Sequence, residues 1–277
     1  MRTIGYLGPE GTFSEGAAVT YDPEAQRVAY PSIPQVTAAI ESGEVDEAIV
    51  PIENSLQGSV TDVLDFLIRT KKARIKSELA IPVNNCLMVS EGTKPGDVEL
   101  IYSHPQPLGQ CRKYLAENFP QIELFASLST AGAVEDMLAS DRPAAAIGPR
   151  RAGEIYGAEI VAEAIQDNPS NFTRFVVLAA VDHERTGRDK TSIAFSFDSD
   201  GPGLLYRAMG TFATRGINLT KIESRPTGES LGRYVFLADV EGHRSDELII
   251  AALDELRGQT SELKVFGSYP QMERPRS

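Results

Sequence analysis

Asn171-Phe172-Thr173-Arg174-Phe175 runs directly into an apolar segment that begins with its last residue, Phe175-Val176-Val177-Leu178-Ala179-Ala180-Val181. This segment is rich in β-branched residues and follows the turn formers Asp167-Asn168-Pro169-Ser170, so it predicts a buried strand. The hydroxyl of Thr173 and the guanidinium of Arg174 therefore lie where a loop enters a core strand, a position from which side chains can face a cleft. A structural alternative stays open at this point, in which Thr173 bonds nearby backbone and Arg174 is a solvated flank.

The residues before this strand alternate short apolar runs with helical patterns, which is typical of α/β architecture. Three capping patterns predict helix starts, namely Thr12-x-x-Glu15, Ser32-x-x-Gln35 and Ser59-x-x-Asp62. A strand is expected over 47–52, where Pro51 indicates a strand end or a sheet edge.

Loops followed by helices recur after the predicted strands, at 8–14, 53–62, 103–110 and 129–131. Open α/β sheets bind ligands at the carboxyl ends of their strands, so we expect these loops to line one cleft between two lobes. In the third of them, Leu108, Cys111 and Leu115 form a helical stripe that places Gln110 on a neighbouring face.

The pattern resets after a charged segment at 182–190, which we interpret as a linker between domains. Residues 191–269 then predict the order β-α-β-β-α-β, which is ferredoxin-like, and 270–277 are expected to form a tail. The preceding domain, 1–181, is expected to hold two lobes, approximately 1–80 with 164–181, and 81–163.

Composition excludes several classes of function. The net charge of −12 argues against nucleic-acid binding, and no apolar run approaches the roughly 18 residues that a membrane span needs. The three histidines show no zinc-type spacing, so we expect no metal and no other cofactor. Two cysteines, Cys86 and Cys111, fit buried thiols in a reducing cytoplasm.

Five motifs, taken in order along the chain, resemble those of prephenate dehydratase with its C-terminal ACT regulatory domain. The motifs are Gly8-Pro9-Glu10-Gly11-Thr12-Phe13-Ser14, Pro51-Ile52-Glu53-Asn54-Ser55-x-x-Gly58, Ser103-His104-Pro105-Gln106 with Gln110-Cys111, Asn171-Phe172-Thr173-Arg174-Phe175, and Gly216-Ile217-Asn218-Leu219 with Glu223-Ser224-Arg225-Pro226. The resemblance covers nearly the whole chain and indicates the monofunctional form, because no chorismate mutase segment precedes residue 1. It implies a two-lobed, periplasmic-binding-protein-like catalytic domain with a cleft.

The resemblance also implies a reaction and a set of site residues. The family removes carbon dioxide and hydroxide from prephenate to give phenylpyruvate, and Thr173 would assist the departing hydroxide. The implied catalytic residues are Thr173, Asn54, Ser103 and Gln110, and the implied substrate-binding residues are Thr12, Phe13, Ser14, Ser55, Phe172 and Arg174. Arg174 ranks lower, because successive side chains of an extended stretch point to opposite faces. Thr12 and Ser59 also fit simple helix caps.

For the small domain, the resemblance implies L-phenylalanine as an allosteric effector, bound where two such domains pair in a homodimer or homotetramer. The implied effector residues are Gly203, Leu204, Asn218, Leu219, Glu223 and Ser224. One departure is Gly203-Leu204-Leu205, where the family usually has an alanine after the glycine. Two alternatives stay open: arogenate in place of prephenate as substrate, and a ligand-binding regulator with no enzymatic activity.

Overall fold

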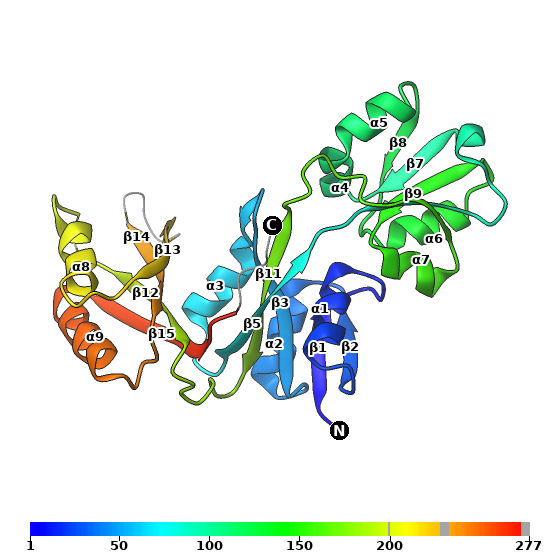
Figure 1. The fold of residues 1–277 in the computed structure, drawn as a ribbon. Coiled ribbons are helices and arrows are strands. Elements are labelled where there is room, and N and C mark those ends of the chain that lie inside the picture. Colours follow the sequence, from blue (N-terminus) through cyan, green and yellow to red (C-terminus); the bar gives the residue numbers. More distant parts are fainter. Residues whose placement is uncertain (199, 228–232, 273–277) are drawn as a thin grey trace. The chain divides into compact units, whose positions relative to one another are not determined.

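The computed structural model describes residues 1–198, 200–227 and 233–272, and its strands form three sheets with flanking helices (Figure 1). Contacts between Cα atoms divide the chain into two compact units. The first contains Met1–Val63 and Leu79–Phe175, and the second contains Leu64–Glu78 and the described residues from Val176 onward. The predicted α/β class is confirmed.

The first sheet has the strand order β2-β1-β3-β11-β5, and the short strand β4 pairs with β3. Its strands are β1 (Thr3–Leu7), β2 (Gln26–Tyr30), β3 (Glu47–Asn54), β4 (Gly58–Ser59), β5 (Arg74–Pro82) and β11 (Phe172–Ala179). Its helices are α1 (Phe13–Tyr21), α2 (Ile33–Ser42) and α3 (Thr61–Arg69). The predicted strand after the Asn171 motif is therefore present and begins three residues early, at Phe172.

Two of the three predicted helix caps are confirmed. The Thr12 hydroxyl accepts from the Glu15 N–H at the start of α1, and the Ser32 hydroxyl accepts from the Gln35 N–H at the start of α2. The cap at Ser59 stays a prediction: Ser59 pairs with Glu53 in β4, and α3 begins two residues later, at Thr61.

The prediction that Pro51 marks a strand end or edge is also wrong. Strand β3 continues to Asn54 and lies inside the sheet. Proline is tolerated there because the β1–β3 pairing reaches only to the Tyr6–Ile49 pair, so its missing N–H is not needed for that ladder.

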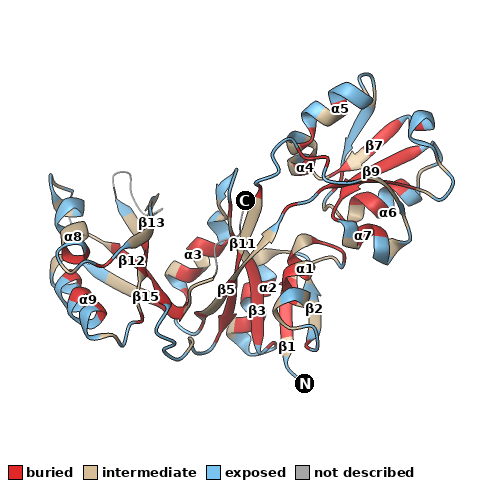
Figure 2. Ribbon diagram, in the orientation of Figure 1, coloured by how far each residue is buried: buried red, intermediate tan, exposed pale blue. Residues whose placement is uncertain are grey.

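The second sheet lies wholly within the first unit and has the order β10-β6-β9-β7-β8. Its strands are β6 (Cys86–Val89), β7 (Leu100–Ser103), β8 (Glu123–Ala126), β9 (Ala144–Gly148) and β10 (Glu159–Ala162), with the 3-10 turn η1 (Pro95–Asp97) before β7. Its helices are α4 (Pro105–Gln110), α5 (Arg112–Asn118), α6 (Gly132–Leu138) and α7 (Arg150–Tyr156). All five residues of β9 are buried between these layers (Figure 2).

The helical stripe predicted through Cys111 is divided between two helices. Cys111 ends α4 and precedes α5, and its thiol is buried with an exposure of 0%. Burial raises the pKa of Cys111 to about 12. The interpretation of Cys86 and Cys111 as buried thiols is confirmed, since both are free and buried.

The small domain has the predicted order β-α-β-β-α-β, and its sheet order is β13-β14-β12-β15. Its elements are β12 (Asp189–Ser196), α8 (Leu204–Ala213), β13 (Leu219–Pro226), β14 (Tyr234–Glu241), α9 (Glu247–Gln259) and β15 (Glu262–Pro270). Both helices contribute to one core that includes Phe212 and Leu256.

The exact domain boundaries stay a prediction. Strand β12 already begins at Asp189, within the segment expected to be a linker, and β15 runs one residue into the expected tail. The end of that tail, 273–277, lies outside the described residues. Over the described ranges, no helix has the length and apolar character needed to cross a bilayer.

Candidate active site

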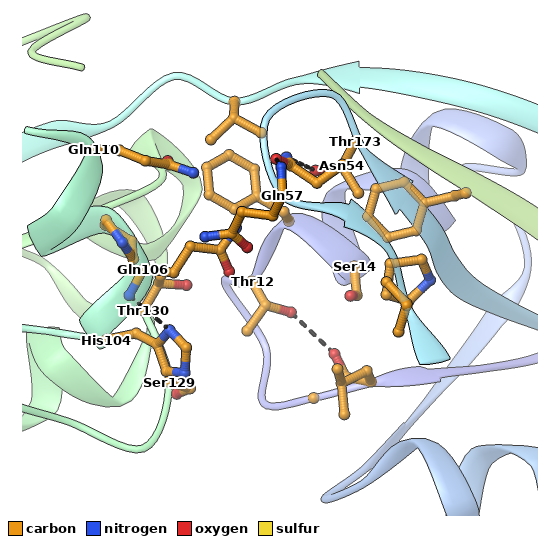
Figure 3. A pocket seen from close by; sticks show the side chains of 18 of the residues that line it. Thr12, Ser14, Asn54, Gln57, His104, Gln106, Gln110, Ser129, Thr130 and Thr173 are labelled. Carbon is orange, nitrogen blue, oxygen red and sulfur yellow. Dashed lines mark hydrogen bonds between the residues drawn. The ribbon is translucent and has the colours of Figure 1, made fainter. Parts of the chain in front are cut away.

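A cavity of about 390 Å³ lies in the first unit (Figure 3). Its volume is in the range of small-molecule sites. It is lined by residues that follow strands of both sheets of this unit: Leu7, Gly8, Thr12, Phe13, Ser14, Pro31, Pro51, Asn54, Gln57, Gly58, Ser59, Val60, Val83, His104, Gln106, Pro107, Gln110, Leu128, Ser129, Thr130, Thr173 and Phe175. The four predicted loops therefore converge, as expected from the rule that α/β sheets bind ligands at strand ends.

The lining is polar but carries no fixed charge. No Asp, Glu, Lys or Arg is among the described residues that line the cavity, and His104 is the one titratable side chain there. Helices α1, α3 and α4 all begin at or next to lining residues. Free N–H groups at helix N-termini favour anions, so an anionic ligand can be stabilised here without a buried cation.

Asn54 and Thr173 form a directed hydrogen-bond pair at the cavity. Asn54 Nδ2 donates to Thr173 Oγ1 over 3.0 Å. Asn54 Oδ1 accepts from the backbone N–H groups of Leu56 and Gln57, which fixes the amide's orientation. Thr173 Oγ1 is thus an acceptor from Asn54, and its own proton has no acceptor among the described residues.

Gln110 presents an amide N–H₂ group to the same cavity. Its Oε1 accepts from Asn85 Nδ2 over 3.5 Å, which assigns Nε2 to the other side. Nε2 is buried without a hydrogen-bond partner in the described chain. In Figure 3 the Gln110 side chain points toward the space between Gln106, Asn54 and Thr173. It is therefore a free donor for a ligand.

His104 caps the helix that carries Gln106 and Gln110. Its Nδ1 accepts from the Gln106 N–H over 3.3 Å, which places the proton of the neutral ring on Nε2. Burial lowers the pKa of His104. The ring is therefore a neutral N–H donor near neutral pH.

Three of the predicted residues beside α1 line the cavity, although Thr12 has little spare hydrogen-bonding capacity. The Thr12 hydroxyl donates toward Pro9 O (2.9 Å) and Leu7 O (3.2 Å) while capping the helix. Thr12 therefore acts first as a cap. Phe13 and Ser14 supply an apolar wall and a further hydroxyl.

The predicted residues Ser103, Ser55, Phe172 and Arg174 are not among those that line the cavity. The Ser103 side chain is fully buried, and its hydroxyl donates to Ile147 O over 2.7 Å. The Ser55 hydroxyl accepts from the Phe172 N–H. Arg174 lies 3.5 Å from Glu53, on the other face of β11 from Thr173, as the alternation of strand side chains predicts.

Several lining residues lie in the loops expected to line the cleft but were not named as site residues, among them Gln57, Gln106, Ser129 and Thr130. Gln57 and Gln106 lie within or next to quoted motifs, so a search for amide donors in those loops was the available signal. The Ser129 hydroxyl accepts from the Gly132 N–H at the start of α6 over 2.8 Å.

The two sheets of this unit are joined by an ion pair next to the cavity. Glu15, which is 3% exposed, accepts from Arg151 Nε (2.7 Å) and Nη2 (2.6 Å) and from the Gly11 N–H (2.8 Å). Burial raises the pKa of Glu15, but the hydrogen bonds from Arg151 and Gly11 outweigh it, and the net pKa is lowered.. Gly11 has φ +82°, and a Cβ there would lie 2.9 Å from Ala152 Cα, so only glycine allows this close approach.

Comparison with known proteins assigns the chain to a family. A family model described as "Prephenate dehydratase" matches residues 4–183, and one described as "ACT domain" matches residues 199–258. The chain belongs to the prephenate dehydratase family.

Individual members of the family match over almost their entire length. A prephenate dehydratase from Lactococcus lactis is 39% identical and is aligned over 96% of this chain and 96% of its own. The crystal structure of prephenate dehydratase from Arthrobacter aurescens in complex with L-Phe has a TM-score of 0.89 at 35% identity, covering 97% of this chain and 90% of that one. A structure described as a novel type of quorum-quenching acylase has a TM-score of 0.88 at 29% identity, with 98% of each chain covered. The predicted family and fold class are confirmed.

In the ACT domain, two of the expected effector residues line different hollows of the described chain. Leu204 lines one hollow with Phe236, and Asn218 lines another with Arg215. Leu219 packs against the domain core, and Glu223 and Ser224 lie in β13. Gly203 precedes α8 with φ +82°, a conformation that favours glycine. Their effector role stays a prediction.

Proposed function

We propose that the cavity converts prephenate to phenylpyruvate, carbon dioxide and hydroxide in L-phenylalanine biosynthesis, with Thr173 as the donor to the departing hydroxide. The observation that carries this proposal is the 3.0 Å bond from Asn54 Nδ2 to Thr173 Oγ1. Because that bond uses Thr173 as an acceptor, the Thr173 proton remains available to a ligand.

The chemistry demands little more than positioning and help to the leaving group. The C–C bond to the ring carboxylate breaks, carbon dioxide leaves, and the electron pair of that bond enters the ring. The C–O bond to the ring hydroxyl breaks at the same time, and hydroxide leaves with the electron pair of the C–O bond. The gain of aromaticity makes the step downhill. A threonine hydroxyl is a weak acid, so Thr173 acts as a positioned hydrogen-bond donor, with help typically worth about 100- to 10,000-fold.

Neutral donors bind the two carboxylates of prephenate. Gln110 Nε2 is an unpartnered donor on the cavity, and the N-termini of α1 and α3 add backbone N–H groups. These neutral donors can therefore bind the dianion without a buried Lys or Arg side chain.

The test is prephenate turnover by the full chain, with and without L-phenylalanine. Thr173→Ala is expected to lose at least about 100-fold in kcat, while Thr173→Ser retains a measurable part. Thr20→Ala is the matched control, because Thr20 is exposed on α1 and its hydroxyl bonds only the Gly16 carbonyl. Equal activity in Thr173→Ala would refute the role, and turnover of arogenate alone would reassign the substrate.

Acyl-amide hydrolysis is a second candidate, because one structural neighbour carries an acylase description. A hydroxyl nucleophile needs a general base within hydrogen-bond reach. His104 is the one imidazole on the described lining, and its Nδ1 is used by the Gln106 N–H rather than by a serine or threonine. The geometry therefore favours the dehydratase.

Regulation and assembly follow the same proposal. The ACT match supports inhibition by L-phenylalanine through residues 191–269. We infer in addition that the protein is a homodimer or homotetramer in the cytoplasm. The separation of Leu204 from Asn218 within one chain is what a site completed by a paired domain would require. Loss of turnover on adding L-phenylalanine supports this regulation, whereas unchanged turnover in the full chain argues against it and leaves the dehydratase assignment intact.

A further inference from the structure

Asn171 is buried directly beside the Asn54–Thr173 pair. Its side chain is 1% exposed, and its Oδ1 accepts from Asn54 Nδ2 (2.9 Å) and from Ser55 Oγ (3.3 Å). Its backbone carbonyl accepts from the Val83 N–H over 2.8 Å. Asn171 is thus fixed in place by contacts from two separate segments of the chain, at 54–55 and at Val83.

The Asn171 oxygen holds the Nδ2 end of the Asn54 amide, while the Leu56 and Gln57 N–H groups hold its oxygen end. Asn54 Nδ2 has two protons and donates toward Asn171 Oδ1 and Thr173 Oγ1, with Phe172 O at 3.3 Å as a weaker partner. If the amide flipped, its oxygen would face the Asn171 oxygen, and two acceptors would meet without a proton between them. The oxygen of Asn171 therefore keeps a donor pointed at Thr173.

The other half of the Asn171 amide makes no contribution to hydrogen bonding. Its Nδ2 is buried and has no partner within the described residues. A buried N–H without a partner destabilises a fold, so an asparagine used only for stability would be a poor choice here. The Asn171 atom that forms hydrogen bonds is Oδ1, which accepts from the Asn54 amide in one orientation only.

We propose that Asn171 is a positioning residue that orients Asn54, so that Thr173 accepts from Asn54 and keeps its own proton for the leaving hydroxide. The inference rests on the proposed dehydratase activity. Asn171 acts through Asn54, and it lines a neighbouring hollow that shares Gln57, Gln106 and Gln110 with the cavity.

Two substitutions separate this role from simple support. Asn171→Ala removes the acceptor, and kcat for prephenate is expected to fall about 10- to 100-fold with KM within about threefold of wild type. Asn171→Asp keeps the acceptor oxygen but adds a negative charge near the cavity, so kcat is expected within about threefold of wild type and KM is expected to rise. Equal losses of kcat in both variants would overturn the proposal.

A double-mutant cycle tests whether Asn171 works through Asn54. If it does, adding Asn171→Ala to Asn54→Ala leaves kcat unchanged within about twofold, whereas independent effects multiply. Should Asn171→Ala fail to fold, Asn171→Asp decides alone, and a fall in its kcat of more than about tenfold refutes the role. A wild-type chain that is inert toward prephenate refutes the proposed activity itself, a result distinct from any of these.

Discussion

The cavity and the buried ion pair between β5 and β12 differ in the charge of their side chains. No ionised side chain is among the described residues that line the cavity, whereas the Glu78 and Lys190 side chains in the second unit are 0% and 7% exposed. Lys190 Nζ lies 2.8 and 3.1 Å from the two Glu78 oxygens. Buried charge occurs where a fixed partner of opposite sign neutralises it. The cavity instead presents neutral donors, because its partner is a ligand that comes and goes.

The largest expected effect comes from removing one charge of that buried pair. Lys190→Met leaves the Glu78 carboxylate buried without its cation, which is expected to cost about 3–5 kcal/mol of unfolding free energy. Thermal unfolding should show a Tm lower by about 10 °C or more. The double variant Glu78→Leu with Lys190→Met is the matched control and is expected to recover most of the loss. A single variant as stable as wild type would show that the pair contributes little.

The second effect comes from placing a charge where the cavity has none. Gln110→Glu changes the free donor into a carboxylate, and two like charges about 5 Å apart at an effective dielectric of about 20 repel by about 3 kcal/mol. The value of kcat/KM for prephenate is therefore expected to fall roughly 100-fold, mostly through KM. Gln121→Glu makes the same change at an exposed position outside the cavity and should leave kcat/KM unchanged. Similar values for both variants would mean that Gln110 does not face the substrate.

Comparing the sequence predictions with the structure shows how much of the fold could be predicted from the sequence. The β-α-β-β-α-β order and the convergence of the four loops could be predicted, because hydrophobic periodicity and strand ends record them directly. Strands β2 and β8 were missed, since each has only three apolar residues in a row and neither has a fully buried residue. Element type therefore follows from the sequence best where burial is strong.

Side-chain partners were harder to predict than elements. Ser103 opens a quoted motif and is the last residue of β7, yet its hydroxyl donates to the Ile147 carbonyl of the adjacent strand β9 and is not free for a ligand. Asn171 and Asn54 are distant in sequence, and only the folded chain shows that one orients the other. Which polar atoms remain free for a ligand depends on such tertiary partners, and local sequence does not record them.

The smallest expected effect concerns His104, the one titratable group on the described lining. Burial lowers its pKa, so the unfolded chain, with an ordinary value of about 6.5, binds a proton more readily than the folded chain. The contribution of neutral His104 to the unfolding free energy is therefore fully present above about pH 6.5 and is lost as the pH falls below that value. Protonation also competes with the cap from the Gln106 N–H to Nδ1, and a helix cap is typically worth about 1 kcal/mol.

His104→Asn removes the titration and keeps an acceptor for the Gln106 N–H, since asparagine is a good N-cap residue. Urea unfolding at about pH 7.5 and about pH 5.5 is expected to show a smaller loss of unfolding free energy in this variant than in wild type, and the titration can account for at most about 1.4 kcal/mol of the difference. His183→Asn lies outside the cavity and should leave the wild-type pH dependence unchanged. Acid pH has the opposite effect on substrate binding, because a protonated His104 attracts the prephenate dianion and should lower KM. If KM rises in wild type as the pH falls while His104→Asn shows the same rise, the imidazole does not contact the substrate, and the neutral amides and helix ends bind it alone.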